Sequence, residues 1–185
     1  MEYRAKVSLI GSERTGKTSL ILRYLKNTFT NEYLTTLGAD FIDKTYTHEN
    51  LAGLDQGDEL IITYWDQAGQ AHFKQIAEIY CEGSAGMIIV FDVNDPSSFE
   101  EIPNWVEFAQ KVAPEAKLII VGNKVDLEFK VSKAEIQKLE KQMEIPVHLT
   151  SAKVELKDDL SNVCNVFDEI AQKIIIQHKQ DKNNE

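Results

Sequence analysis

Short apolar runs alternate with stretches of helical periodicity along most of the chain. Two runs, residues 85–93 and 117–122, are almost continuously apolar, which predicts strands that are buried on both faces of a sheet. Other segments are short and bounded by turn residues, and we expect further strands at 4–10, 40–47, 59–65 and 145–150. The polar connection of about ten residues between the second and third of these predicts a hairpin.

The remaining periodic segments carry apolar residues at helical spacing, and we expect helices at 17–25, 95–112, 132–143 and 160–176. Ser97 or Ser98 is expected to cap the second of these helices, and Ser132 with Glu135 has the spacing of a capping box. Because strands alternate with helices, the pattern predicts an α/β doubly wound sheet. The ligand site of such a fold lies at the carboxyl ends of the strands.

The composition narrows the classes of function. The chain has 185 residues, with 20 Lys and Arg against 30 Asp and Glu, and a formal net charge of −10. This charge argues against a nucleic-acid-binding surface and against electrostatic attachment to anionic membranes. The longest apolar runs have about five residues, far below the roughly 20 that a membrane-spanning helix needs. With only Cys81 and Cys164, we expect reduced thiols and a single-domain cytoplasmic protein.

The first chemical motif directly follows the first predicted strand. It reads Gly11-Ser12-Glu13-Arg14-Thr15-Gly16-Lys17-Thr18 and fits the phosphate-loop pattern G-x-x-x-x-G-K-[ST] between a strand and a helix. The glycines allow the backbone to wrap a phosphate, and the N–H groups at the helix N-terminus point toward it. Lys17 is placed for the β- and γ-phosphates of a nucleoside triphosphate, and the Thr18 hydroxyl for Mg²⁺.

Motifs at two further strand ends indicate which base is bound. The first, Asn123-Lys124-Val125-Asp126, follows the buried strand at 117–122. The Asp126 carboxylate can accept both the N1–H and the exocyclic amino group of guanine, a pair of donors that adenine does not present on that edge. The second, Thr150-Ser151-Ala152-Lys153, follows the next strand and reaches the same edge of the sheet.

A fourth motif follows the strand at 59–65 and reads Asp66-Gln67-Ala68-Gly69-Gln70. Asp66 is positioned for the second shell of Mg²⁺, and Gly69 can present its backbone N–H to a γ-phosphate. The four motifs in this order, each at a strand end, predict a site for guanine nucleotide with Mg²⁺.

These motifs together resemble the Ras-like small GTPases over about residues 4–177. Three runs are most similar to the Rab branch: Thr36-Leu37-Gly38-Ala39-Asp40-Phe41, Trp65-Asp66-Gln67-Ala68-Gly69-Gln70 and Tyr80-Cys81-Glu82-Gly83-Ser84-Ala85. The resemblance implies a three-layer phosphate-loop NTPase G domain at residues 1–177, with a six-stranded, mostly parallel sheet and helices on both faces. A short polar tail at 178–185 would follow it.

The resemblance also implies roles for residues outside the phosphate loop. Thr36 would ligate Mg²⁺ and contact the γ-phosphate in the GTP state, and Gln70 would orient the attacking water. Phe29 would stack on guanine and Tyr33 would cover the phosphates, although Phe29 could also be a core aromatic and Tyr33 a surface residue. Ser151, Ala152 and Lys153 would form the loop that supports the base.

The implied function is a molecular switch in Rab-like vesicle trafficking or in signalling. Bound GTP and Mg²⁺ would hold two switch segments, and hydrolysis to GDP would release them. The expected partners of this slow, monomeric GTPase are effectors, exchange factors and GTPase-activating proteins. One alternative is a GTP-binding interaction module with negligible hydrolysis, because Glu13 and Arg14 stand where the family usually has small residues. A phosphate-loop enzyme of another class, such as a nucleoside kinase, is disfavoured by Asp126 and Gln70.

The sequence departs from the family pattern at several other places. Gln67 stands where Thr is usual, and Ala71 replaces a common Glu. The connection at 47–59 is several residues longer than is typical. The sequence as given ends without the cysteines that carry prenyl groups in membrane-cycling members, so it predicts no lipid anchor by that route.

Overall fold

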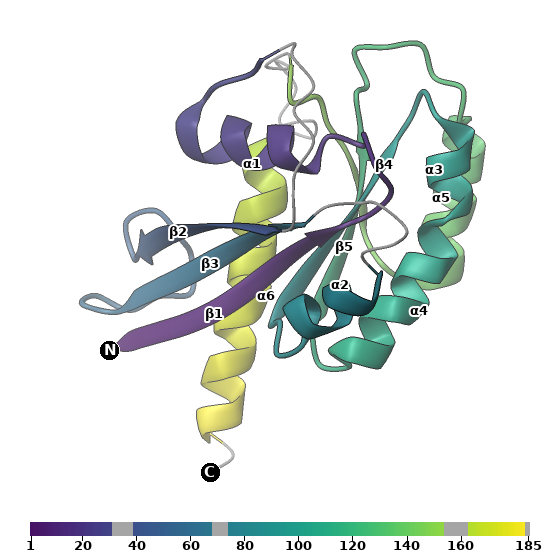
Figure 1. Cartoon of the computed structure of the whole chain (residues 1–185). Helices are drawn as coiled ribbons and strands as arrows, with labels where there is room; N and C mark the ends of the chain where they lie inside the picture. The colour runs from purple at the N-terminus through teal and green to yellow at the C-terminus, as the bar shows by residue number, and fades with distance from the viewer. Residues whose placement is uncertain (31–38, 68–73, 154–162, 184–185) are drawn as a thin grey trace.

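A six-stranded mixed sheet forms the centre of the computed structural model, which describes the chain except residues 31–38, 68–73, 154–162 and 184–185 (Figure 1). The strands are β1 (Glu2–Ile10), β2 (Ala39–Thr47), β3 (Glu59–Gln67), β4 (Gly86–Asp92), β5 (Lys117–Asn123) and β6 (Val147–Leu149). Their order is β2-β3-β1-β4-β5-β6, in which β2 and β3 pair antiparallel and the other neighbours pair parallel. The predicted mixed, mostly parallel sheet is confirmed.

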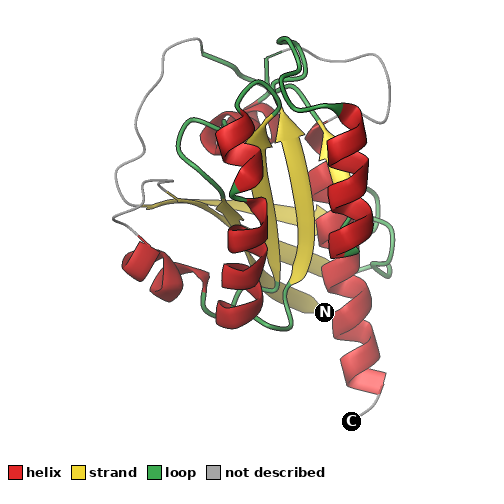
Figure 2. Ribbon diagram, turned by 90° about the vertical axis from the view of Figure 1, so that its right-hand side faces the viewer, coloured by secondary structure: helices red, strands yellow, loops and turns green. Residues whose placement is uncertain are grey.

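Helices cover both faces of this sheet (Figure 2). They are α1 (Lys17–Lys26), α2 (Lys74–Cys81), α3 (Pro96–Glu100), α4 (Ile102–Val112), α5 (Lys133–Met143) and α6 (Val163–Asn183). Helices α1 and α6 pack on one face, and the other helices pack on the opposite face. The molecule therefore has the three layers that the resemblance implied.

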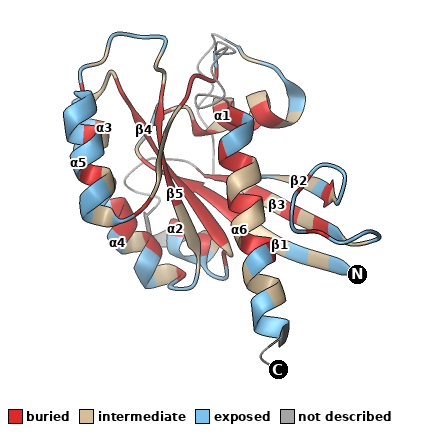
Figure 3. Ribbon diagram, turned by 180° about the vertical axis from the view of Figure 1, so that it is seen from behind, coloured by how far each residue is buried: buried red, intermediate tan, exposed pale blue. Residues whose placement is uncertain are grey.

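Each face of the sheet has its own apolar core, and β4 contributes to both (Figure 3). Ile88 and Val90 face the α1/α6 side, whereas Met87, Ile89 and Phe91 face the side of α4 and α5. Because successive strand residues point to opposite faces, a strand with helices on both sides is apolar at every position. This explains the continuous apolar run in the sequence.

The predicted helix at 95–112 is wrong in its continuity and in its cap. The chain forms α3 and then α4, and Pro103 lies at the start of α4, where its missing N–H leaves no intrahelical bond unmade. Neither Ser97 nor Ser98 caps α3, because Pro96 occupies its first turn and the Asp95 side chain accepts the Ser97 N–H. The capping box between Ser132 and Glu135 is confirmed at α5.

Other element boundaries differ from the expected ones. Strand β6 is shorter than the expected 145–150, while α6 continues to Asn183 instead of ending at 176. Helix α2 was not expected from the pattern. Apart from α2, these differences lie at the ends and connections of elements, and the order of strands along the chain is as predicted.

The long β2–β3 connection, residues 48–58, folds onto α6. Leu51 is only 2% exposed, and it is packed in the same apolar core as Ile175 of α6. A Cβ built on Gly53 would lie 3.2 Å from Cγ2 of Ile175, so backbone and helix are in close contact. Asp55 forms an ion pair with Lys179 at 2.6 Å. The connection is therefore a packed part of the fold.

Candidate nucleotide-binding site

The predicted motifs converge at the carboxyl ends of the parallel strands. The phosphate loop joins β1 to α1, Asp66 lies near the end of β3, Asn123 ends β5, and residues 150–153 follow β6. Since β3, β1, β4 and β5 are neighbouring parallel strands, their ends form one edge of the sheet.

The phosphate loop has a backbone shape that only glycine accepts at two points. Gly11 and Gly16 have φ of +136° and +95°. A Cβ on Gly11 would lie 2.2 Å from the Val90 carbonyl oxygen, and one on Gly16 would lie 2.3 Å from Nδ2 of Asn123. Between them, the hydroxyl of buried Thr15 donates to the Ser12 carbonyl at 3.0 Å and holds the loop closed.

Lys17 lies inside this loop and is almost fully buried, with 6% of its surface exposed. Its Nζ donates to the carbonyl oxygens of Gly11 at 2.9 Å and Ser12 at 2.8 Å. Burial lowers the pKa of Lys17 to about 8, although the carboxylates of Asp66 and Glu13 favour its charged form. An ammonium group with so little solvent is strongly attracted to a polyanion that replaces the lost hydration.

Thr18 and Asp66 bring a hydroxyl and a carboxylate oxygen together next to the phosphate loop. The Thr18 hydroxyl lies 2.5 Å from Oδ2 of Asp66, and Asp66 is buried. Hydroxyl and carboxylate oxygens are the ligand types that Mg²⁺ prefers. The pair therefore fits a magnesium ion between α1 and the end of β3.

Asn123 connects three of the predicted segments. Its Nδ2 donates to the Thr15 carbonyl of the phosphate loop at 2.9 Å. Its Oδ1 accepts the Ala152 N–H at 3.3 Å and the Thr150 hydroxyl at 3.4 Å. Because this amide is buried and bonded on both sides, it joins the phosphate loop and the 150–153 loop.

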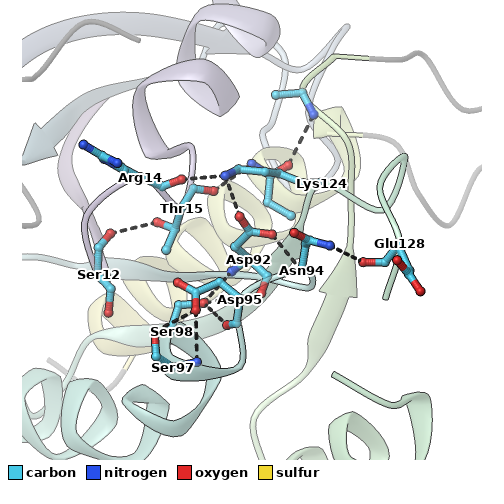
Figure 4. Close-up of polar contacts among 12 residues, drawn as sticks. Ser12, Arg14, Thr15, Asp92, Asn94, Asp95, Ser97, Ser98, Lys124 and Glu128 are labelled. Carbon is cyan, nitrogen blue, oxygen red and sulfur yellow. Dashed lines mark hydrogen bonds and ion pairs between the residues drawn. The ribbon is translucent and has the colours of Figure 1, made fainter. Parts of the chain in front are cut away.

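Lys124 makes a second connection to the phosphate loop (Figure 4). Its Nζ donates to the Arg14 carbonyl at 2.7 Å and forms an ion pair with Asp92 at 2.5 Å. Asp92 ends β4 and was missed by the motif analysis. The available signal was a carboxylate closing a buried apolar strand at the ligand edge of the sheet.

Asp126 and Ser151 meet at the exposed end of the site. The Ser151 hydroxyl donates to Oδ1 of Asp126 at 2.6 Å, and the Lys153 N–H donates to the Ser151 hydroxyl oxygen at 3.2 Å. Asp126 is exposed and can accept donors from a base. The structure thus brings together Asn123, Asp126 and the 151–153 loop.

Other predicted site residues stand apart or lie outside the described residues. Phe29 is half-buried and packs against the α1/α6 core. Glu13 and Arg14 are exposed neighbours, with Arg14 Nε 3.9 Å from a Glu13 carboxylate oxygen and Arg14 in the left-handed region at φ 64°. Residues that lie outside the described part of the chain are Tyr33, Thr36, Gly69, Gln70 and Ala71.

Comparison with known proteins decides the family. The profile described as the Ras family matches residues 6–176, which is nearly the whole chain. The chain belongs to the Ras family. Its relatives include the Ras-related protein RabC of Dictyostelium discoideum, 36% identical over 98% of this chain and 89% of the relative. The Ras-related protein Rab-13 of Bos taurus is 35% identical over 95% of this chain and 82% of its own length.

A third relative, the Ras-related protein SEC4 of Candida albicans, is 35% identical over 97% of this chain and 80% of its own length. This member of the Ras family is thus a Rab-like small GTPase, which confirms the resemblance seen in the sequence. None of the helices described for it is both long enough and apolar enough to cross a membrane.

Proposed function

We propose that this Rab-like GTPase binds GTP and GDP with Mg²⁺, hydrolyses GTP to GDP, and thereby controls effector binding in vesicle trafficking. The main support for this proposal is that the Asn123 side chain is hydrogen-bonded to both the phosphate loop and the 150–153 loop. Two loops linked in this way form one site. The phosphate loop suits the phosphates of a nucleotide, and the 150–153 loop suits its base.

The phosphate end of the site is built from the phosphate loop and Lys17. The buried ammonium group now bonded to the carbonyls of Gly11 and Ser12 exchanges these bonds for β- and γ-phosphate oxygens. Because this charge is fixed by the fold before the nucleotide arrives, it stabilises negative charge that develops on the phosphates during hydrolysis.

The metal position lies between α1 and β3. Thr18 and Asp66 would hold Mg²⁺, directly or through water, and Thr36 is the proposed further ligand in the GTP state. When bound, the ion neutralises charge on the β- and γ-phosphate oxygens. Gln70 is the residue that we propose to orient the attacking water.

The base end of the site selects guanine. Asp126 accepts the two adjacent donors of guanine, while Ser151 holds one of its carboxylate oxygens at 2.6 Å. Adenine lacks this pair of donors, so the carboxylate would lose its bonds in an adenine complex. Phe29 is the proposed stacking partner of the base, and Tyr33 is proposed to cover the phosphates.

The proposed function can be tested on the purified protein by identifying its bound nucleotide and by measuring GTP hydrolysis. The nucleotide released by denaturing the purified protein is identified by chromatography, and phosphate release from GTP and Mg²⁺ is then followed in a single turnover. We expect GDP or GTP, and slow hydrolysis that an activating protein accelerates. Recovery of ATP or ADP would contradict the proposal.

A second candidate function is GTP-binding without appreciable turnover, and Glu13 favours it. This exposed carboxylate lies in the phosphate loop, and its charge partly offsets the lowering of the Lys17 pKa by burial, so it stands near the triphosphate position. If it hinders hydrolysis, Glu13→Gly increases the single-turnover rate constant. Equal rate constants in the two proteins, with GTP turned over by both, favour the switch. Retention of GTP by the native protein for days favours the interaction module.

The partners of the protein and its location in the cell are part of the same proposal. As a switch, the protein acts as a monomer in the cytoplasm, and its partners are effectors, exchange factors and GTPase-activating proteins. No lipid anchor is needed for the nucleotide chemistry described above.

A further inference from the structure

Arg23 lies outside every nucleotide motif, yet its side chain contacts the base end of the site. It belongs to the last turn of α1. Its Nε donates to the Ala152 carbonyl oxygen at 2.7 Å, and its Nη2 donates to the Lys153 carbonyl oxygen at 3.2 Å. Its Nη1 donates to Asn27, at 2.8 Å to Oδ1 and at 3.3 Å to the backbone oxygen. One guanidinium group therefore joins two separate segments of the chain.

The first segment is the loop that carries Ser151. The peptide between Ala152 and Lys153 is held at both ends, because its carbonyl accepts from Arg23 and its N–H donates to the Ser151 hydroxyl oxygen at 3.2 Å. The same Ser151 hydroxyl donates to Asp126. A continuous series of hydrogen bonds thus runs from the Arg23 guanidinium to the carboxylate that reads the base.

The second segment is the point where the chain leaves α1. Asn27 caps the helix with φ 50°, in the left-handed conformation that ends many helices, and its N–H bonds to the Arg23 carbonyl. Arg23 therefore binds Asn27 through both its backbone and its side chain. Phe29, the proposed stacking residue, follows directly after this turn.

Arginine is suited to this position in a way that lysine is not. Its planar group carries five N–H donors in a fixed arrangement, so it can reach three carbonyls and a side-chain amide at once. A lysine ammonium is a single point with three donors and cannot span both segments in the same geometry.

We propose that Arg23 is a positioning residue for guanine-nucleotide binding. It holds the 151–153 loop and the end of α1 in the arrangement that receives the base, and so slows nucleotide release. It touches neither the phosphate loop nor the Thr18–Asp66 pair in the contacts described, so its effect falls on binding and not on the hydrolysis step. This inference rests on the function proposed above.

The test compares Arg23→Met with Lys26→Met, an exposed lysine in the same helical turn. GDP release is measured by displacing a fluorescent GDP with excess unlabelled GDP. Loss of charge-assisted hydrogen bonds predicts release about 10- to 100-fold faster for Arg23→Met, with the Lys26 variant within about twofold of the native protein. Arg23→Lys should lie between these two.

A second readout separates positioning from general damage to the fold. With protein in excess over GTP, the first-order hydrolysis constant of the bound nucleotide should stay within about twofold in Arg23→Met, because the phosphate end is unchanged. A parallel fall of the hydrolysis constant, or GDP release as slow as in the Lys26 variant, would overturn the proposal.

A third variant keeps the proposal testable if Arg23→Met does not fold. Asn27→Gly removes only the amide that accepts from Nη1 and retains a residue that tolerates the left-handed conformation. We expect GDP release about two- to fivefold faster. An unchanged rate would show that the bond between Arg23 and the Asn27 side chain does not slow release. If the native protein binds no guanine nucleotide, the proposed function fails; if it binds and the variants do not differ, only the Arg23 inference fails.

Discussion

Two separate features require glycine at position 11: its backbone conformation and its close contact with a neighbouring strand. Gly57 has only the first of these features. The φ of +136° at Gly11 strains any side chain, and a Cβ there would meet the Val90 carbonyl at 2.2 Å. Gly57 also has a positive φ, of +86°, but a Cβ there would meet nothing within 4 Å. Backbone strain alone costs about 1–2 kcal/mol, whereas the clash in the first case requires β1 and β4 to move apart.

We therefore predict that Gly11→Ala destabilises the protein by more than about 3 kcal/mol and abolishes nucleotide binding, while Gly57→Ala costs about 1–2 kcal/mol. Urea unfolding of both variants measures the difference. Equal destabilisation would mean that the close approach to Val90 contributes nothing.

Asp126 provides the prediction on base recognition. In Asp126→Asn, one of the two acceptors becomes an amide donor, so the amino group of guanine loses its partner while a carbonyl at the same ring position gains one. We expect GTP affinity to fall by about 100-fold or more, and xanthosine triphosphate to become the preferred ligand. Competition binding of the two nucleotides measures this preference, and an unchanged preference for GTP would show that another group reads the base.

Among individual residues, the sequence predicted those that belong to the nucleotide motifs better than those that hold the motif residues in place. Lys17, Asn123 and Asp126 are recognisable because their chemistry requires fixed spacing within one segment. Asp92 and Arg23 act across segments, one on Lys124 and the other on the 151–153 loop. Such pairings depend on which strands become neighbours, and single-segment spacing carries no information about that.

Among the elements, α2 is attached to β3 by a buried side-chain pair. Nε2 of Gln67 lies 3.2 Å from Sγ of Cys81, which in turn lies 3.6 Å from Oε1 of Gln67. Burial raises the pKa of the Cys81 thiol, so it stays protonated and can donate. Gln67 is the residue that replaces the usual Thr, and its longer side chain reaches the end of α2.

Removing the thiol leaves part of the buried Gln67 amide without this partner. We predict that Cys81→Ala destabilises the protein by about 1–3 kcal/mol and speeds amide hydrogen exchange in α2. Cys81→Ser should recover part of the loss because serine can both donate and accept. Cys164→Ala, at an exposed position of α6, is the matched control and should leave hydrogen exchange in α2 near the native value.

Glu169 of α6 lies between Lys173 of the same helix and His148 of β6, and this cluster gives a pH dependence. Burial alone would raise the pKa of Glu169, but Lys173 at 2.7 Å and His148 at 2.8 Å outweigh it, and the pKa is lowered overall. Since the unfolded state then binds the proton more readily, this contribution to stability is present above about pH 4.3 and is lost as the pH falls through the lowered value.

We predict that Glu169→Gln lowers the free energy of unfolding at pH 7 by about 0.5–1 kcal/mol, because the pair is partly exposed. The difference from the native protein should close as the pH falls below about 4. Glu107→Gln, at an exposed position of α4, is the control and should show no such convergence. Unfolding curves across the acid range decide between these outcomes.

The elements themselves show where a hydrophobic pattern is informative. Strand β4 was predictable because burial on both faces leaves a continuous apolar run. The break between α3 and α4 was not, because the apolar spacing continues across it and only Pro103 marks it. Helix α6 continues past 176, where the His178 ring lies against Tyr3 of β1 and Lys179 pairs with Asp55 of the β2–β3 connection, contacts that local periodicity does not contain.

Across the whole molecule, the β2–β3 hairpin contacts α1 and α6 through both hydrogen bonds and apolar packing. The hydroxyls of Tyr24, Tyr46 and Tyr64 form a buried hydrogen-bonded series, and Tyr24 also donates to Asp168 of α6 at 2.8 Å. Leu51 lies farther along the hairpin, in the apolar core that it shares with α6. The hairpin, α1 and α6 therefore pack as one body on this side of the sheet.

The apolar and ionic parts of the contact with α6 should contribute unequally. Leu51 is 2% exposed, so Leu51→Ala leaves a cavity and should lower the free energy of unfolding by about 2–4 kcal/mol, with faster hydrogen exchange in residues 176–183. Asp55→Asn removes an ion pair with a 79% exposed carboxylate, and the unfolding midpoint should stay within error of the native value. Because β3 runs from this connection toward Asp66, the contact lies at the opposite end of the sheet from the nucleotide site. Leu51→Ala should therefore hydrolyse bound GTP at the native rate below its unfolding temperature; a slower rate would show that the packing on α6 is coupled to the phosphate site along β3.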